Sequence, residues 1–293
     1  MRTRTVIPSM LLALAFMLAH QVIWAQSEFR SSHFMTSDGA KLHYLEVGSG
    51  PTLVFVPGWT APSEIWEPQL HYFANTHRVI ALDPRSQGRS EKTTDGHYLV
   101  RRGKDIGELI EHLGAEPAVV IGWSLGVLEI LTYAQEFGTD LFRGVVLVDM
   151  FIGRDLKPGD PPPLAAPWLS QLQVDREAFT NTFVRGLFRS EQSEEYLNTL
   201  ARALLKTPTN TAVTLVTNVY PLGSGDWRPA LESLDRPVLY VVAGSTDQAG
   251  MVKKLRPDAR IEVFEDAGHA LFVDEPERFN RVLEGFLATL PQQ

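Results

Sequence analysis

The chain has 293 residues, with 27 Lys and Arg against 35 Asp and Glu, and a formal net charge of −8 at pH 7. Because nucleic-acid phosphates are bound by clustered Lys and Arg, this acidic chain is not expected to bind nucleic acid. The absence of cysteine excludes disulfides, thiolate metal ligands and a cysteine nucleophile. With 44% hydrophobic residues, a chain of this length can bury the core of one large α/β domain.

The first 25 residues have the features of a secretory signal peptide. Arg2 and Arg4 precede an apolar stretch over residues 6–19, and Ala25 is a small residue at the expected cleavage site. The apolar stretch is shorter than the roughly 20 residues that span a bilayer. We therefore expect cleavage after Ala25 and export to the periplasm or the medium, without a stable membrane span in the mature chain. An uncleaved N-terminal anchor is the alternative.

Short apolar runs alternate with helical patterns through the mature chain. Apolar runs bounded by turn residues are typical of strands in a parallel sheet that is covered on both faces. The strand-helix-strand order predicts an α/β fold, with a mostly parallel sheet and helices on both faces. A hairpin is predicted over residues 29–35 and 41–47, strands at 52–56, 78–82, 118–121, 145–148, 238–242 and 261–264, and helices at 99–113, 125–137 and 277–290.

Residues 151–236 interrupt this alternation, because they contain no β-rich run. The first part of this segment, from Pro158 to Pro167, is rich in proline, which favours an extended connection over a helix. We expect a helical cap here, inserted into an α/β core formed by residues 26–150 and 237–293. Its helical patterns lie at 177–188, 193–206 and 209–220.

The segment Gly122-Trp123-Ser124-Leu125-Gly126 matches the G-x-S-x-G motif. A predicted strand precedes it and a predicted helix follows, which is the context that a nucleophile elbow requires. Glycines two residues to either side of Ser124 allow a sharp turn without a Cβ clash, and such a turn exposes the hydroxyl. The N-terminus of the following helix directs N–H groups to the place where negative charge develops. We predict that Ser124 is a catalytic nucleophile.

Of eight histidines, only His269 follows Ser124 in the chain. It lies between the last predicted strand and the terminal helix. A histidine on a loop at that edge of the sheet can accept the proton of a serine hydroxyl and return it to the leaving group. We predict that His269 is the catalytic base.

Two acids qualify as the third residue, which orients the imidazole and stabilises its charged form. Asp247 follows the strand at 238–242, and Asp149 ends the preceding strand. We favour Asp247, because it follows a glycine-containing turn and gives the chain order Ser, Asp, His. Asp149 is the alternative acid. Asp266 and Asp274, on either side of the histidine, are interpreted as solvated loop charges.

With these residues in place, the sequence from about Met35 to the C-terminal helix resembles the α/β-hydrolase family. The segment Val56-Pro57-Gly58-Trp59 resembles the oxyanion loop of the family, although Pro57 replaces its usual His. Residues 83–90 resemble its D-x-R-G-x-G-x-S segment, with Ser86 in place of a Gly. The resemblance implies the α/β-hydrolase fold, a Ser-His-Asp site and an oxyanion hole formed by the backbone N–H groups of Trp59 and Leu125.

The resemblance also implies a serine hydrolase that cleaves a carboxylic ester or lactone of a small molecule through an acyl-enzyme. The layout is most similar to small esterases, lactonases and cofactor-free haloperoxidases. Perhydrolysis with peroxide and C–C bond hydrolysis use the same three residues and remain alternatives, as does a non-catalytic ligand-binding role. No metal and no organic cofactor is expected, because neither an H-E-x-x-H motif nor a P-loop occurs in the sequence.

Other residues carry weaker signals. Arg85 and Arg89 are interpreted as structural anchors of their loop rather than as an anion site. Glu129 lies among apolar residues of the helix predicted after Ser124, and the sequence suggests no role for it. Five aromatic residues of the cap either shape a pocket or pack the cap onto the sheet, and packing is the preferred interpretation. They are Trp168, Phe179, Phe183, Phe188 and Tyr196.

Overall fold

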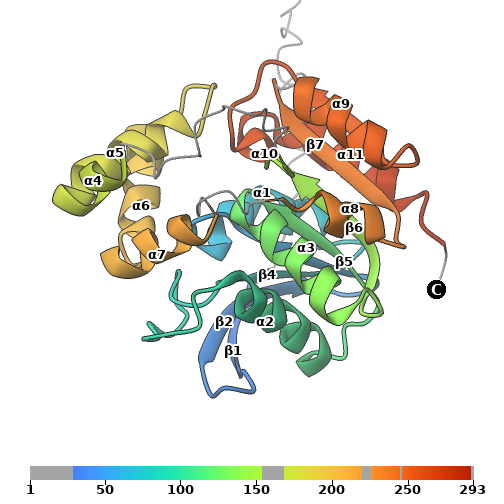
Figure 1. The fold of residues 1–293 in the computed structure, drawn as a ribbon, viewed down its shortest axis with the longest axis horizontal. Helices are drawn as coiled ribbons and strands as arrows, with labels where there is room; N and C mark the ends of the chain where they lie inside the picture. The colour runs from blue at the N-terminus through green and yellow to red at the C-terminus, as the bar shows by residue number, and fades with distance from the viewer. Residues whose placement is uncertain (1–28, 154–167, 220–225, 245, 292–293) are drawn as a thin grey trace, which may run out of the picture.

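The computed structural model describes residues 29–153, 168–219, 226–244 and 246–291, so the predicted signal peptide and the proline-rich segment lie outside the described residues. An eight-stranded sheet in the order β1-β2-β4-β3-β5-β6-β7-β8 forms its centre (Figure 1). β2 is antiparallel to both of its neighbours, and the other strands pair in parallel. The strands are β1 (Arg30–Met35), β2 (Lys41–Gly48), β3 (Thr52–Val56), β4 (Arg78–Leu82), β5 (Ala118–Trp123), β6 (Phe142–Val148), β7 (Val238–Ala243) and β8 (Arg260–Phe264).

The central strands are apolar along their whole length because helices cover both of their sides. Every residue of β3 and β5 is buried. This confirms the mostly parallel sheet that the continuous apolar runs predict. The strand bounds differ from the prediction mainly at the beginning of β6, where residues 142–144 extend the strand.

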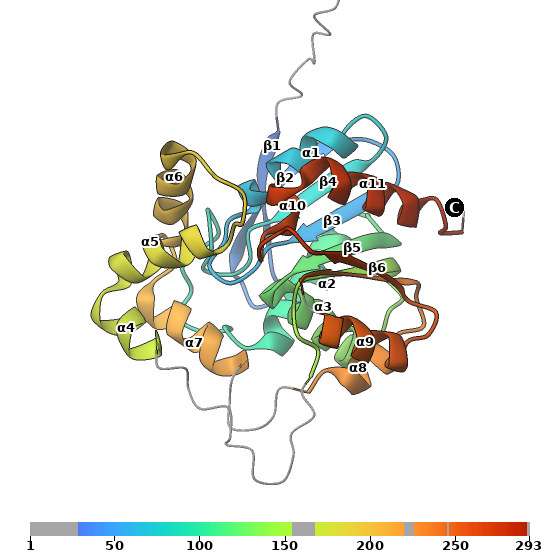
Figure 2. The same ribbon diagram turned by 90° about the horizontal axis from the view of Figure 1, so that it is seen from above.

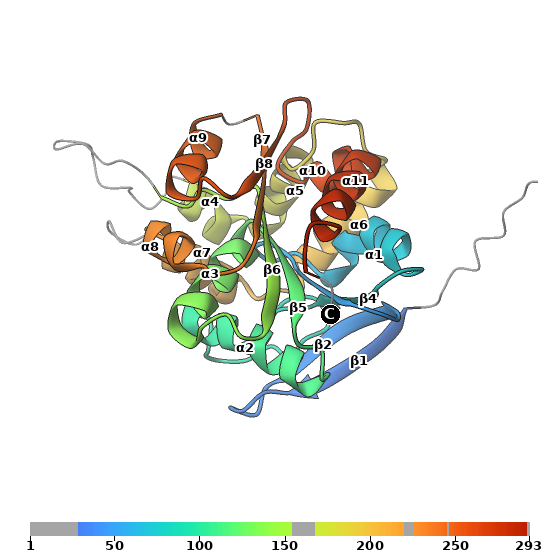
Figure 3. The same ribbon diagram turned by 90° about the vertical axis from the view of Figure 1, so that its right-hand side faces the viewer.

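Two helical layers enclose the sheet (Figures 2 and 3). One face packs against α2, α3, α8 and α9, and the opposite face packs against α1, α10 and α11. The apolar stripe of α11, with Phe279 and Phe286 buried, explains why its pattern was readable in the sequence. The bounds are α1 (Glu67–Phe73), α2 (Leu99–His112), α3 (Leu125–Phe137), α8 (Arg228–Ser233), α9 (Thr246–Leu255), α10 (Leu271–Asp274) and α11 (Pro276–Leu287), with a short 3₁₀ helix η1 (Ser63–Trp66) before α1.

Four helices between β6 and α8 stand to one side of the sheet, where Figures 1 and 2 both place them. They are α4 (Trp168–Val174), α5 (Arg176–Gly186), α6 (Glu194–Leu204) and α7 (Thr209–Val219), and we call them the cap. No strand occurs among the described residues of segment 151–236, in agreement with the helical pattern. Helix α8 also falls in this segment, but it packs on α3 as part of the core.

In the described part of the chain, none of the helices combines the length and apolar character that crossing a membrane demands.

Replacing Phe279 by alanine should lower the free energy of unfolding by about 3–5 kcal/mol, because it leaves a cavity in the core. The ring is fully buried and packs beside the rings of Trp66 and Phe272, which stack on each other. Urea denaturation followed by circular dichroism measures the change. Val174→Ala, at a side chain that is 87% exposed, is the control and should alter stability by less than about 0.5 kcal/mol. A loss below about 1 kcal/mol for Phe279→Ala would contradict this packing.

Candidate active site

Ser124 occupies a strained turn between β5 and α3. Its backbone has φ 53° and ψ −120°, a conformation that costs a non-glycine residue free energy, and its N–H donates to Val148 O at 2.9 Å. A Cβ atom at Gly122 would lie 2.7 Å from the backbone of Gly126, and one at Gly126 would lie 2.6 Å from Val56 O. The two glycines therefore allow the strand, the turn and the helix to pack this closely, as the motif predicts.

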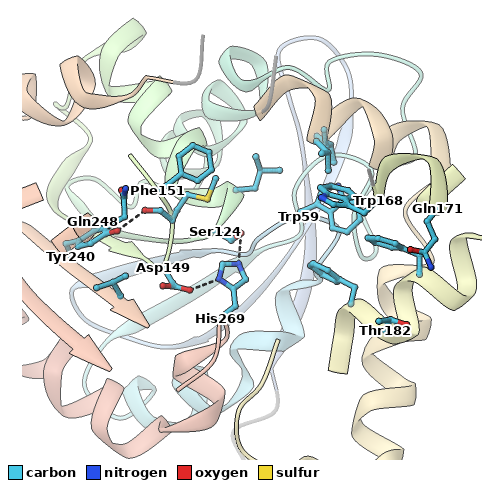
Figure 4. A pocket seen from close by; sticks show the side chains of 17 residues that line it. Trp59, Ser124, Asp149, Phe151, Trp168, Gln171, Thr182, Tyr240, Gln248 and His269 are labelled. Atoms are coloured by element: carbon cyan, nitrogen blue, oxygen red, sulfur yellow. Dashed lines mark hydrogen bonds and ion pairs between the residues drawn. The ribbon is translucent and has the colours of Figure 1, made fainter. Parts of the chain in front are cut away.

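His269 contacts the serine directly. Its Nε2 lies 2.9 Å from Ser124 Oγ, although 145 residues separate the two in the chain (Figure 4). The loop between β8 and α10 carries this histidine. Trp123, the neighbour of the serine, donates from its indole Nε1 to His269 O at 2.8 Å. The strand that ends in the elbow thus also holds the histidine loop in place.

The acid in contact with the imidazole is Asp149, at the end of β6. His269 Nδ1 lies 2.6 Å from Asp149 Oδ2. The second carboxylate oxygen accepts a hydrogen bond from Ala243 N–H at 2.8 Å, and Asp149 N–H donates to Val241 O at 2.8 Å. The adjacent strand β7 therefore fixes both the backbone and the side chain of this aspartate. The sequence-based preference for Asp247 is wrong, and the alternative acid takes this position.

Asp247 is an exposed residue in the first turn of α9, a helix that the sequence pattern did not predict. Helix α9 begins at Thr246, and its first turn leaves Asp247 in solvent while Asp149 contacts the imidazole. The next residue, Gln248, faces the cavity instead and accepts a hydrogen bond from Ile152 N–H at 3.0 Å. Chain order could not separate the two acids, since Asp149 also lies between Ser124 and His269.

Asp274, interpreted from sequence as a solvated charge, is half-buried and accepts several hydrogen bonds. Its Oδ2 accepts from Gly268 N–H at 2.7 Å and from Arg189 N–H at 2.9 Å, and its Oδ1 accepts from Ser190 N–H at 3.1 Å. That interpretation is therefore wrong. The carboxylate ties the histidine loop to the segment that follows α5 of the cap.

The loop after β3 reaches the elbow at Gly58. A Cβ atom on this glycine would lie 2.9 Å from Ser124 Cβ, so the loop lies directly against the serine. Trp59 follows on this loop, and Leu125 is the first residue of α3. Both residues line the same cavity as Ser124, and neither backbone N–H donates to a protein acceptor within the described residues.

Cap residues surround the indole of Trp59. Its Nε1 donates to Ala212 O of α7 at 2.8 Å, and the ring of Phe183 meets it edge-on with centroids 5.1 Å apart. The Arg176 guanidinium lies over the indole, 5.2 Å from the ring centroid. Burial lowers the pKa of Arg176 to about 10, so it remains a cation at neutral pH. Trp59 therefore joins the loop after β3 to the cap.

A cavity of about 710 Å³ opens between the cap and the sheet and contains Ser124 and His269 (Figure 4). Tyr240, at its wall, donates to Met150 O at 2.9 Å, and burial raises the pKa of this phenol. The lining is mostly apolar and aromatic. It includes three of the five cap aromatics, Trp168, Phe179 and Phe183, whereas Phe188 and Tyr196 pack against each other outside it.

In the segment that resembles D-x-R-G-x-G-x-S, Arg85 anchors its own loop, as expected. Arg85 is buried, and its guanidinium binds Asp105 with two hydrogen bonds at 2.9 and 3.0 Å. Ser86, in place of the family's Gly, has φ 65°, the left-handed conformation that glycine favours. Its hydroxyl lies 2.9 Å from His97 Nε2 and accepts from Thr93 N–H at 3.0 Å, which holds the strained residue in place.

A second Ser-His-Asp arrangement shows that distances alone do not define the site. Ser31 Oγ lies 2.8 Å from His43 Nε2, and His43 Nδ1 lies 2.8 Å from Asp83 Oδ2. Ser31, however, belongs to the edge strand β1 and does not line the cavity beside Ser124. Ser124 differs because it combines the strained elbow, a helix N-terminus and the cavity. Among the described residues, no group of three or more His, Asp or Glu side chains is arranged to hold a metal ion.

The chain belongs to the alpha/beta hydrolase family, whose sequence model matches residues 53–282. It is 26% identical over 269 residues to the non-heme chloroperoxidase CPO-A1 of Kitasatospora aureofaciens, which covers 86% of this chain and 98% of that protein. The structure of the esterase RhEst1 from Rhodococcus sp. ECU1013 is similar with a TM-score of 0.76 and 25% identity, over 89% and 99% of the two chains. The esterase EaEST from Exiguobacterium antarcticum has the same fold, with a TM-score of 0.81 and 22% identity over 89% and 100%. The resemblance noted in the sequence is thereby confirmed.

The contact between His269 and Asp149 predicts a strongly deshielded Nδ1 proton in the ¹H NMR spectrum, because the hydrogen bond is short and charge-assisted. Asp149→Asn should move this resonance upfield or remove it. Asp247→Asn, at the exposed residue of α9, is the matched control and should leave the resonance in place. The opposite pattern would contradict the position that the structure assigns to Asp149.

Proposed function

We propose that this member of the alpha/beta hydrolase family is a serine hydrolase that cleaves a carboxylic ester or lactone of a small molecule through an acyl-enzyme. The observation that carries this proposal is the continuous contact from Ser124 Oγ through His269 to Asp149, at the wall of an apolar cavity. On a strained elbow at a helix N-terminus and beside a cavity, a hydroxyl that is hydrogen-bonded to a carboxylate-oriented imidazole is an activated nucleophile.

In the proposed reaction, Ser124 Oγ attacks the ester carbonyl while His269 Nε2 accepts the hydroxyl proton. The imidazolium then donates this proton to the leaving oxygen, and the ester C–O bond breaks to give the acyl-serine. A water molecule, deprotonated by the same nitrogen, attacks the acyl carbon. The bond from that carbon to Ser124 Oγ then breaks, the imidazolium returns the proton to Oγ, and the acid is released. Asp149 remains ionised throughout and accepts from the protonated Nδ1. It thereby holds the imidazole in the tautomer whose unprotonated Nε2 faces the serine.

The backbone N–H groups of Trp59 and Leu125 are the proposed oxyanion donors. Both residues line the cavity beside Ser124. The N–H of Leu125 belongs to the first turn of α3, where N–H groups have no acceptor within the helix. One such donor is worth about 3 kcal/mol of activation free energy.

The size and apolar lining of the cavity favour an uncharged, apolar small molecule as the substrate. Trp59, Trp168, Phe179 and Phe183 form an aromatic wall on its cap side. Apolar walls of this kind bind by removing hydrocarbon surface from water, and a few polar groups at the reacting centre orient the substrate. Esters and lactones with apolar acyl groups fit this description.

Perhydrolysis is a second candidate activity, because one relative with full-length similarity is named a non-heme chloroperoxidase. It uses the same acyl-serine, with hydrogen peroxide in place of water as the attacking group and a peracid as the product. C–C bond hydrolysis would use the same residues with a carbon leaving group. Assays with and without peroxide separate the first of these from ester hydrolysis.

Ser124→Ala should lower kcat on p-nitrophenyl esters at least about 10⁴-fold, because it removes the nucleophile. Asp149→Asn should lower kcat by a similar order, since the imidazole loses its orienting carboxylate. Asp247→Asn should retain wild-type rates. A series from acetate to decanoate on all four proteins measures both the activity and the preferred chain length.

A fluorophosphonate probe provides the control for this assignment. Mass spectrometry should find the label on Ser124 and no label in Ser124→Ala, while Ser31→Ala should be labelled as fast as the wild type. Labelling that depends on Ser31 instead would contradict the proposed nucleophile.

We also propose that the protein is exported by a signal peptide that is cleaved after Ala25. The basic N-terminus, the short apolar stretch and the small residue at the cleavage site support this proposal. Expression of the whole sequence in a Gram-negative host, followed by fractionation and intact-mass measurement, should yield a periplasmic chain that begins at Gln26. A full-length chain in the membrane fraction would indicate the uncleaved anchor.

A further inference from the structure

The two proposed oxyanion donors belong to different elements of the fold. Trp59 lies on the loop after β3, whereas Leu125 begins α3. Oxyanion donors act only when their N–H groups converge on one point, about 2.7–3.1 Å from the developing charge. Some interaction must therefore fix the loop relative to the helix. Its catalytic role rests on the proposed function, because the oxyanion hole belongs to that reaction.

Gln87 binds the loop and is not one of the residues that line the cavity. Its side chain is fully buried, and Nε2 donates to Gly58 O at 3.0 Å and to Ala61 O at 2.8 Å. The Gly58 carbonyl and the Trp59 N–H belong to the same trans peptide group, so they point in opposite directions in one plane. Gly58 O also accepts from Ala61 N–H at 3.2 Å, so Gln87 is one of two donors that hold this oxygen and thereby aim the N–H. It also polarises the peptide, which strengthens the N–H as a donor.

The carboxamide of Gln87 is itself held by a buried arginine. Arg102 Nη2 donates to Gln87 Oε1 at 2.8 Å. Because a guanidinium only donates hydrogen bonds, this contact requires the amide oxygen at that position and leaves the NH₂ group for the two loop carbonyls. The orientation of the amide group is thus determined by its partners at both ends.

Arg102 connects this amide to the elbow helix. Its Nε donates to Glu129 Oε1 at 2.6 Å, and its Nη1 donates to Arg85 O at 2.8 Å. Glu129 lies on α3, one turn after Leu125. Arg102 is carried by α2, which packs closely on α3. A Cβ atom at Gly103 would lie 2.8 Å from Glu129 O, so glycine permits this close approach. A continuous set of buried hydrogen bonds therefore joins the Trp59 peptide to the helix that carries Leu125.

Burying the Arg102–Glu129 ion pair costs desolvation free energy, so stability alone does not account for it. The side chains of Arg102 and Glu129 are each 1% exposed, and Glu129 Oε2 has no hydrogen-bond partner among the described residues. Buried ion pairs are often no more stabilising than apolar residues of similar volume, since desolvation opposes the Coulomb attraction. A positioning role accounts for Glu129, the charged residue on α3 whose presence the sequence alone does not explain.

We propose that Gln87 is a positioning residue for the oxyanion hole, held by the Arg102–Glu129 ion pair so that the Trp59 N–H converges with the Leu125 N–H. Gln87 does not touch the substrate and acts through the Gly58–Trp59 peptide. Losing it misdirects a donor whose acceptor gains negative charge between the bound substrate and the transition state. The loss therefore affects kcat rather than KM.

Gln87→Glu tests this with a side chain of the same shape that can still accept from Arg102 but cannot donate to the two carbonyls as a carboxylate. Gln87→Met removes all three hydrogen bonds. On a p-nitrophenyl ester, both variants should lower kcat about 10- to 100-fold, below the effect of deleting a donor outright, with KM changed less than about twofold.

Ser90→Ala is the matched control on the same loop. The Ser90 hydroxyl donates to Asp83 O and accepts from His43 N–H, so this variant also loses two buried hydrogen bonds, but it does not touch residues 58–61. It should keep kcat within about twofold of the wild type even where its Tm falls as far as that of Gln87→Met. Equal losses of kcat in Ser90→Ala and Gln87→Met, or an unchanged kcat in both Gln87 variants, would overturn the proposal.

Hydrogen exchange gives a readout that does not depend on activity. Peptides covering residues 55–66 should exchange faster in Gln87→Met than in the wild type and in Ser90→Ala. If the wild type hydrolyses no ester and binds no fluorophosphonate, the proposed function fails, while faster exchange would still show that Gln87 anchors the loop. If neither Gln87 variant folds, as judged by circular dichroism, Gln87 is a core residue and the positioning role is rejected.

Discussion

The contact of one imidazole with a hydroxyl on one side and a carboxylate on the other is the interaction on which the site depends. Ser124, Asp149 and His269 lie after β5, β6 and β8, and so reach the same edge of the sheet. Parallel strands place their carboxyl ends together, which is why residues 120 and 145 positions apart can meet. The sheet order is thus a precondition for the chemistry, and the loops supply the reacting groups.

Rigid supports surround this contact. Backbone groups of β7 bind Asp149, and Trp123 and Asp274 hold the histidine loop. Gln87 holds the loop after β3. Each support is buried or half-buried, so water competes weakly for its hydrogen bonds. Preorganisation of this kind keeps dipoles and donors in place before charge develops, which is where electrostatic catalysis obtains most of its effect.

The cap is joined to the reacting centre as well as covering it. Trp59 belongs to the loop beside Ser124, yet its indole is bonded to Ala212 of α7 and lies beneath Arg176 of α5. Asp274 similarly joins the histidine loop to Arg189 and Ser190. The residues that shape the apolar cavity therefore also help to position the residues that would react in it, so substitutions in the cap can alter both binding and rate.

The sequence by itself was sufficient for the alternation of strands and helices, for the turn at Ser124 and for the choice of His269 as its partner. These depend on local apolar periodicity, on glycine spacing, and on His269 being the one histidine after Ser124 in the sequence. Tertiary structure alone decided the acid: Asp149 and Asp247 both satisfy chain order, but Asp149 contacts the imidazole, whereas Asp247 is exposed in the first turn of α9. It also decided the hydrogen-bond partners of Glu129 and Gln87. Their partners are distant in the chain, and a buried hydrogen bond between distant residues leaves no periodic pattern from which it could be read.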